Sequence, residues 1–240
     1  MTTESISFFR TAFFRTAAVT AVPCLVTAAC FIYLLVRFYK RKAPLYLQIF
    51  LAAIGCLFLG KLYNLITAFS LGKLPAAFCP GDLGTFGCFL FLASANFGVM
   101  DHITDDGTQD FRKYRYAALL GPLCVLFITL LNMHCAAGAA AAVMCLLYAI
   151  PIGFASYYSL KQFLFPDMSF LFLKLIKPCN LIAFIMGLLN CAEIYVRMST
   201  PFPAGSLGIV ILFVIVNLLI CAACVLLTIF LERSHRLWQI

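Results

Sequence analysis

The sequence predicts an all-α integral membrane protein, folded as a seven-transmembrane-helix bundle. Hydrophobic residues make up 64% of the 240-residue chain and charged residues only 11%, whereas soluble domains are about half apolar and a quarter charged. The apolar residues also gather in seven stretches close to the length of about 20 residues that a helix needs to cross the hydrocarbon. The predicted spans are 17–38, 44–69, 83–101, 116–133, 136–160, 170–197 and 205–231.

Residues 1–240 are predicted to form a single polytopic membrane domain. The segment 1–16 contains the tandem sequence FFRTAFFRTA, whose aromatic and cationic residues are typical of an interfacial anchor. A removed signal peptide is the alternative, but the first span has full length and ends in the stop-transfer pattern RFYKRK. Residues 232–240 are expected to form a cytoplasmic tail. The links are short, so no soluble catalytic or nucleic-acid-binding domain is expected.

The distribution of Lys and Arg predicts the orientation of the bundle. Loops rich in these residues stay in the cytoplasm, so we expect the N-terminus outside and the C-terminus inside, in a multi-pass protein of the cell membrane. This bias and attraction to anionic lipid explain the net charge of +8, and no nucleic-acid partner is expected. Twelve of the 17 basic residues fall on the predicted inner side: Arg37, Lys40, Arg41, Lys42, Arg112, Lys113, Arg115, Lys161, Lys174, Lys177, Arg233 and Arg236.

Two similar stretches indicate an internal repeat. GTFGCFLFLASAN at 84–96 and GSLGIVILFVIVN at 205–217 both contain two glycines three apart and an asparagine nine residues further on. Glycines at such spacing let neighbouring membrane helices approach closely. The second and sixth spans also match, in GCLFLGKLY and GLLNCAEIY, which align Lys61 with Glu193. Chance similarity between apolar segments is the alternative explanation.

The repeat predicts a 3+1+3 parallel arrangement. Residues 17–101 form the first three-helix unit, 116–133 the linker helix and 136–231 the second unit. This layout is similar to that of the SWEET sugar transporters. The resemblance is one of architecture, because the chain lacks the Pro-Gln dipeptide of related half-size proteins, so no residue roles follow from it. A retinal protein would need a Schiff-base lysine in the last span, and 205–231 contains none; no cofactor is expected.

Lys61 and Glu193 are ionisable side chains inside predicted spans, at aligned positions of the repeat. A charge in the hydrocarbon is costly unless it is paired or faces water. Both residues should lie at similar depth in the outer half, so we predict an intramembrane ion pair near an outer gate. In the alternative, Lys61 extends alone toward the interface and Glu193 pairs with Arg197 one turn later.

Several uncharged polar residues also fall inside the spans. Asparagine amides in hydrocarbon require partners, and parallel repeats bind solutes between their halves near the midplane. We therefore predict a solute pocket. The alternative is a set of interhelical hydrogen bonds that only hold the bundle together. The predicted pocket residues are Asn96, Asn217, Ser94, Tyr63 and Tyr195.

Two further groups are candidates for metal binding and for a disulfide. Asp101 and Asp105 are four residues apart in the polar run MDHITDDGTQDFRKYR, a spacing that puts both carboxylates on one helical face for a divalent cation. The alternative there is a set of salt bridges to the basic residues that follow. Cys79 and Cys135 fall in predicted outer links, where an oxidising environment allows a disulfide.

The leading functional hypothesis is a transporter or permease-like protein for a small polar solute. The alternative is a non-enzymatic sensor or accessory subunit that acts through a cytoplasmic protein partner. Aspartates four apart also resemble the metal-diphosphate sites of membrane prenyltransferases, which makes a metal-dependent transferase a third hypothesis. Those enzymes have two aspartate clusters and this chain has one, so no enzyme is predicted. The lipid bilayer is the one partner that every hypothesis requires.

Overall fold

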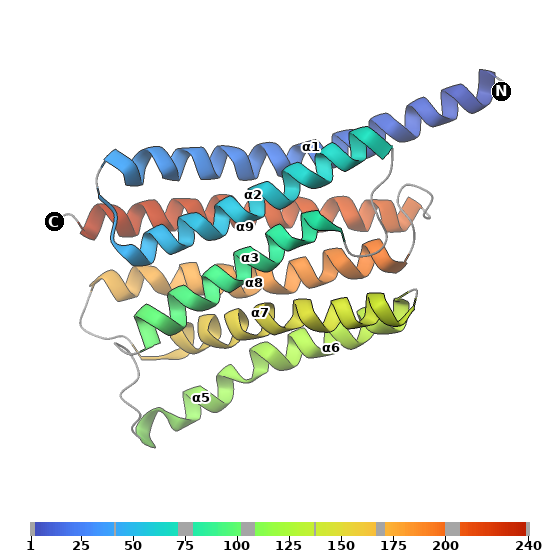
Figure 1. The fold of residues 1–240 in the computed structure, drawn as a ribbon. Helices are drawn as coiled ribbons and strands as arrows, with labels where there is room; N and C mark the ends of the chain where they lie inside the picture. Colours follow the sequence, from blue (N-terminus) through green and yellow to red (C-terminus); the bar gives the residue numbers. More distant parts are fainter. Residues whose placement is uncertain are drawn as a thin grey trace.

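The computed structural model describes residues 3–40, 42–71, 79–101, 109–136, 138–166, 171–199 and 207–238, and within these residues all regular secondary structure is helical. The long helices lie side by side, and the chain starts at one end of the bundle and finishes at the opposite end (Figure 1). We call these two ends the N-end and the C-end.

The helical elements follow one another with short connections. In chain order they are α1 (Thr3–Lys40), α2 (Leu45–Leu71), α3 (Pro80–Ser94), the π-helix η1 (Ala95–Asp101), the 3-10 turn η2 (Gln109–Phe111), α5 (Arg112–Ala118), α6 (Leu120–Cys135), α7 (Ala139–Leu164), α8 (Leu171–Ser199) and α9 (Leu207–Trp238).

Six helical stretches in the described part of the chain are long and apolar enough to cross a membrane, which agrees with the predicted helical membrane bundle. The predicted third span, 83–101, is not among them. Its 15-residue α-helix α3 passes directly into the seven-residue π-helix η1, and the two together extend toward the C-end (Figure 1). The six stretches are Ala17–Lys40, Leu45–Leu71, Arg112–Cys135, Ala139–Leu164, Ile176–Met198 and Gly208–Leu237.

The ends of the bundle are more helical than the sequence indicates. The predicted tail 232–240 is helical as far as Trp238, because α9 continues beyond the predicted span. Glu232 accepts a hydrogen bond from Arg236 one turn later at 2.6 Å and lies 3.5 Å from Arg37 of α1. His235 packs on Phe38 of the same neighbour, with ring centroids 5.0 Å apart. These contacts with α1 stabilise the last turns of α9.

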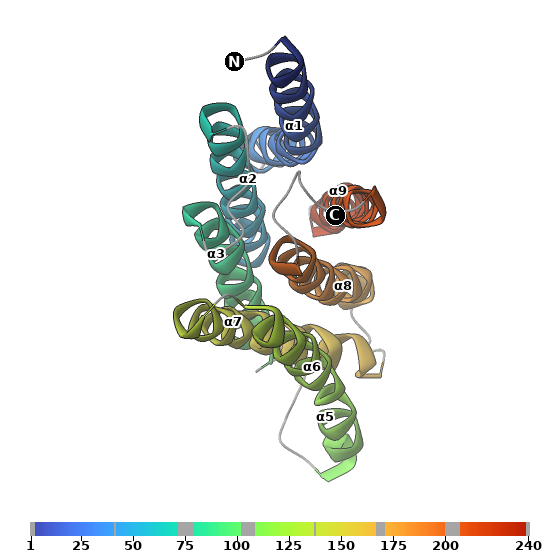
Figure 2. The same cartoon turned by 90° about the vertical axis from the view of Figure 1, so that its right-hand side faces the viewer.

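Six helices form a closed ring, seen from the N-end in Figure 2. Around it, α1 packs on α2, α2 on α3, α3 on α7, α7 on α8, α8 on α9, and α9 on α1. The linker helix α6 lies outside this ring against α7 and α8. We call α1 to η1 the first half and α7 to α9 the second half; the first helix of each half contacts the last helix of the other.

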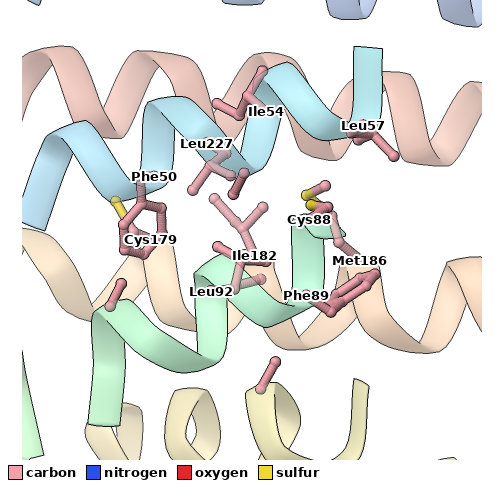
Figure 3. Close-up of a cluster of buried hydrophobic side chains, with 14 of the residues drawn as sticks. Phe50, Ile54, Leu57, Cys88, Phe89, Leu92, Cys179, Ile182, Met186 and Leu227 are labelled. Atoms are coloured by element: carbon pink, nitrogen blue, oxygen red, sulfur yellow. The ribbon is translucent and has the colours of Figure 1, made fainter. Parts of the chain in front are cut away.

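The centre of the ring is filled by apolar side chains over the middle of the bundle. Figure 3 shows these side chains pointing into the space between α2, α3, α8 and α9. They are fully or almost fully buried, and we call them the apolar layer. Its members are Phe50, Ile54, Leu57, Cys88, Phe89, Leu92, Cys179, Ile182, Met186 and Leu227.

One of the two predicted glycine seams is a close helix contact. A Cβ atom at Gly84 would lie 2.5 Å from the Cys56 carbonyl oxygen and from the backbone of Gly60, so α2 and α3 touch through their backbones there. The second seam differs, because Gly208 has open space around its Cα and Gly205 lies outside the described residues. At the aligned positions Gly87 and Gly208, a Cβ atom would lie 3.2 Å from the Cys56 sulfur in the first stretch and near nothing within 4 Å in the second, so this position of the motif has no shared packing contact.

Candidate functional site

Lys61 and Glu193 form a buried ion pair near the N-end of the bundle. The ammonium nitrogen of Lys61 lies 2.6 Å and 2.8 Å from the two carboxylate oxygens of Glu193. Their side chains are only 6% and 9% exposed. Asn217 of α9 completes the contact, because its Oδ1 lies 3.5 Å from the ammonium. The pair joins α2 of the first half to α8 of the second.

A second buried ion pair lies closer to the N-end. Arg197, in the last turn of α8, donates a hydrogen bond from Nη2 to Asp82 Oδ1 at 2.5 Å, and both side chains are less than 10% exposed. Asp82 also caps α3, since its other oxygen accepts the backbone N–H of Cys79 at 3.0 Å. Pro80 at the first helical position and a carboxylate at the third are both favourable at a helix N-terminus.

Sequence reasoning missed the Asp82–Arg197 pair. Arg197 is the last residue of the predicted span 170–197, where a charged side chain is expected to reach the interface, whereas α8 continues past it to Ser199 and holds it buried. The signal was the sequence CPGD at 79–82, which reads as a helix start with a capping carboxylate. The alternative partner considered for Glu193, Arg197 on its own helix, is paired with Asp82 instead.

These residues form one polar cluster with two small cavities. We call Lys61, Asn64, Asp82, Glu193, Arg197 and Asn217 the N-end cluster. One cavity, of about 20 Å³, reaches Asp82, Asn132 and Arg197. The other, of about 10 Å³, reaches Lys61, Glu193 and Arg197. A space of roughly 10–15 Å³ is enough for one water molecule, so the cavities are water-sized and Arg197 lines both.

A separate polar cluster lies near the C-end. Asn96 is fully buried; it accepts a hydrogen bond from the Tyr46 hydroxyl at 3.2 Å and donates one to Ser159 Oγ at 3.1 Å. Asp101 pairs with the buried ammonium of Lys161 at 2.5 Å. We call these five residues the C-end cluster. Its contacts join η1 to α2 within the first half and to α7 of the second half.

The π-helix explains how Asn96 and Asp101 both reach α7. Residues five apart point about 140° away from each other on an α-helix. A π-helix closes i to i+5 hydrogen bonds, so residues five apart lie on the same side of the helix. The wider turn of η1 thus directs Asn96 toward Ser159 and Asp101 toward Lys161 on one neighbouring helix.

The five predicted pocket residues do not line one cavity. Asn217 contacts Lys61, whereas Asn96 contacts Tyr46, about 22 Å along α2 from Lys61. The two asparagines therefore lie at different depths, because α9 and α3 are not in the register that the repeat assigns to them. Ser94 and Tyr63 are exposed on the outside of their helices, and Tyr195 is partly buried against a small apolar cluster.

The predicted metal site and the predicted disulfide are not formed by the described residues. Asp101 is paired with Lys161, and Asp105 lies outside the described residues. Where the chain is described, no three metal-ligating side chains come together. Cys79 and Cys135 are not joined by a disulfide. The Cys79 thiol instead lies 3.3 Å from Asn64 Oδ1, within the N-end cluster, because the helix cap of α3 turns it inward.

A large hollow of about 610 Å³ opens on the outer surface of the bundle, between α6 and α7. It has no charged lining residue, and it lies on the face that meets lipid in a membrane. We therefore place no polar chemistry in it. Its lining comprises Leu119, Pro122, Val125, Leu126, Leu146, Ala149, Ile150, Gly153, Phe154, Tyr157 and Tyr158.

Comparison with known proteins gives no relative from which a role can be transferred: no family model, no curated protein and no solved structure matches the chain at a significant level. The fold and the composition define a polytopic helical membrane protein. Its function must therefore be argued from the two polar clusters and the apolar layer between them.

Proposed function

We propose that this protein is a transporter for a small polar solute that works by alternating access between its two halves. The observation that carries the proposal is that polar contacts cross between the halves at both ends of the bundle. Lys61–Glu193 and Asp82–Arg197 do so near the N-end, and Asp101–Lys161 near the C-end. The apolar layer separates the two sets.

This arrangement fits a mechanism with two gates. Breaking the N-end pairs while the C-end pair holds would open the interior toward one side of the membrane, and the reverse would open the other side. Charged pairs suit such gates, because each charge regains hydration when its side opens to water. In the described residues the ion pairs are formed at both ends, and the cavities of the N-end cluster are only water-sized.

The alignment of α2 with α8 supports the same mechanism, although α3 and α9 are out of the register that the repeat assigns. The aligned residues Lys61 and Glu193 contact one another, as residues near a pseudo-two-fold axis do. Their aligned neighbours pack alike, since Gly55 of α2 faces Phe31 of α1 and Gly187 of α8 faces Ile152 of α7. Parallel repeats of this kind place a solute site between halves that rock against each other. In this proposal η1 completes a seventh span and the N-end faces outward.

Uptake into proteoliposomes tests the proposal. The purified full chain would be reconstituted and offered radiolabelled sugars, amino acids, nucleosides and vitamins. We expect uptake of one solute class above protein-free vesicles, and at least a tenfold loss of that uptake in Lys61→Met. Glu232→Gln is the matched control, because Glu232 belongs to a partly exposed ion pair away from both clusters. Failure of every solute class to enter would contradict the proposal.

One observation favours a second function, that of a sensor or accessory subunit. The C-end carries many exposed cations, a surface suited to an acidic cytoplasmic partner or to anionic lipid. A protein of this kind would co-purify with its partner and take up none of the solutes. The exposed basic residues are Arg37, Lys40, Lys42, Arg112, Lys113, Arg233 and Arg236.

A further inference from the structure

Two buried polar atoms in the larger N-end cavity have no hydrogen-bond partner among the described residues. They are the donor Arg197 Nε and the acceptor Asn132 Oδ1. Both side chains are at most 5% exposed. Unpartnered buried polar groups are rare and costly, and each calls for an explanation such as a bound molecule.

The orientation of both side chains is fixed by their other atoms. Asn132 donates its amide nitrogen to the Cys191 carbonyl at 3.3 Å, which leaves the oxygen for the cavity. Arg197 uses Nη2 for Asp82 and approaches the Cys79 thiol with Nη1 at 3.7 Å, which leaves Nε–H. The residues that line this cavity therefore offer a free donor on the Arg197 guanidinium, a free acceptor on Asn132 and the carboxylate of Asp82.

The charges of the N-end cluster are divided evenly between the halves. The first half supplies one cation, Lys61, and one carboxylate, Asp82; the second half supplies Glu193 and Arg197. Each half thus presents one charge of each sign when the halves separate. A ligand of single charge would leave a net charge buried on closure, which is expensive in the membrane. A ligand with one charge of each sign would not.

We propose that this cavity is the head-group site for a small zwitterion that carries an ammonium with N–H donors and a carboxylate. The ammonium would donate to Asn132 Oδ1 and Asp82, and the carboxylate would accept from Arg197. This inference rests on the proposed transport function and specifies its substrate class. The cavity is water-sized in the described form and is surrounded by the Cys145, Cys191 and Met198 side chains. The smallest zwitterions, glycine and alanine, are therefore the expected ligands, and they would enter when the N-end pairs separate.

Ligand-dependent thermal stabilisation of the purified full chain tests this inference. A ligand that binds only the folded state raises the unfolding midpoint. We expect glycine and L-alanine to raise it in a saturable manner. Acetate and methylammonium, which each carry one of the two charges, should not do so at the same concentration, and glucose should not.

Two variants test the location of the site. Arg197→Lys keeps the positive charge but removes the Nε donor, and Asn132→Leu removes the acceptor at similar side-chain size. Each should weaken glycine affinity at least tenfold, measured by binding of radiolabelled glycine. Asn190→Leu is the matched control: Asn190 is also buried with an unpartnered Oδ1, but it does not line this cavity, so its affinity should equal that of the wild type.

The outcomes distinguish this inference from the proposed function. Stabilisation and uptake of glucose, with no effect of glycine or alanine, would overturn the zwitterion class and leave transport standing. Unchanged glycine affinity in both variants would overturn the site. The absence of any effect of glycine on the wild type would mean that the cavity holds water only, and absence of all solute uptake would overturn both proposals. The comparison of solutes on the wild-type chain does not depend on the folding of any variant.

Discussion

At the scale of single residues, the Lys61–Glu193 pair is a contact with a large expected energetic coupling, because both side chains are buried. Removing one partner of a buried pair leaves an uncompensated charge and costs about 3–5 kcal/mol, whereas apolar replacement of both is often neutral. We therefore expect Lys61→Met and Glu193→Met each to lower the free energy of unfolding by about this amount, and the double variant to regain most of it.

A double-mutant cycle in mixed micelles measures this coupling. The Arg37–Glu232 pair supplies the control, because the Arg37 side chain is 44% exposed and exposed pairs contribute at most about 1 kcal/mol. Additive effects of the two Met substitutions would show that Lys61 and Glu193 do not interact in the folded protein.

The sequence was informative about residues whose chemistry conflicts with their surroundings. Lys61 and Glu193 could be identified because an ionisable group within an apolar run is rare. Asp82 and Arg197 were missed because they lie at helix ends, where polar residues are ordinary and burial depends on how far the neighbouring helix extends. The pairing of Lys161 with Asp101 was missed for the same reason.

At the scale of the elements, the α2–α3 crossing positions the N-end cluster. Gly60 precedes Lys61 on α2, and Gly84 lies two residues after Asp82 on α3, so this backbone contact fixes the separation of the two charged side chains. We expect Gly84→Ala to lower the free energy of unfolding by about 1–3 kcal/mol, because the new Cβ would meet backbone atoms at 2.5 Å.

Thermal unfolding of this variant and of Gly208→Ala provides the comparison. Gly208 is also helical, and nothing lies within 4 Å of the Cβ that alanine would add. That substitution should be neutral or slightly stabilising, since alanine is the better helix former. Equal midpoints for the two variants would show that α2 and α3 do not touch at Gly84.

The long helices could largely be predicted from the sequence. Their positions relative to one another along the bundle axis could not. Composition and length indicate each long helix, because an apolar segment of about 20 residues has few other structures open to it in a bilayer. The π-helix η1 has no periodicity of its own in the sequence, and it decides that Asn96 faces α7. Likewise, the glycine motif fixes the position of Asn217 in the sequence but not its depth in the bundle. That depth depends on where α9 lies along its neighbours.

At the scale of the whole molecule, the basic residues of the C-end predict the orientation. We expect an epitope tag after residue 240 to be detected in intact cells only after permeabilisation, and a tag before residue 1 to be detected without it. The doubly tagged chain gives an internal control, because each molecule carries both tags. Detection of both tags on the same side would require an even number of crossings and would exclude a membrane-spanning α3–η1 segment.

The two sets of contacts between the halves also predict opposite effects on opening. Breaking Lys61–Glu193 with Glu193→Gln should favour forms open at the N-end, and breaking Asp101–Lys161 with Asp101→Asn should favour forms open at the C-end. Native thiols report each opening, because Cys145 lines an N-end cavity and Cys179 is the buried thiol beside Phe50 at the C-end edge of the apolar layer (Figure 3).

Maleimide modification of the full chain in nanodiscs, mapped by mass spectrometry, separates the two cases because both ends are accessible to the reagent. In Glu193→Gln we expect modification of Cys145 to increase severalfold while Cys179 stays protected, and in Asp101→Asn the reverse. Cys88 also lies in the apolar layer but away from its C-end edge, beside Leu57 and Met186 (Figure 3), and should be protected in both. A parallel increase at all three thiols would indicate local unfolding of the bundle and would contradict a mechanism in which one end opens while the other stays closed.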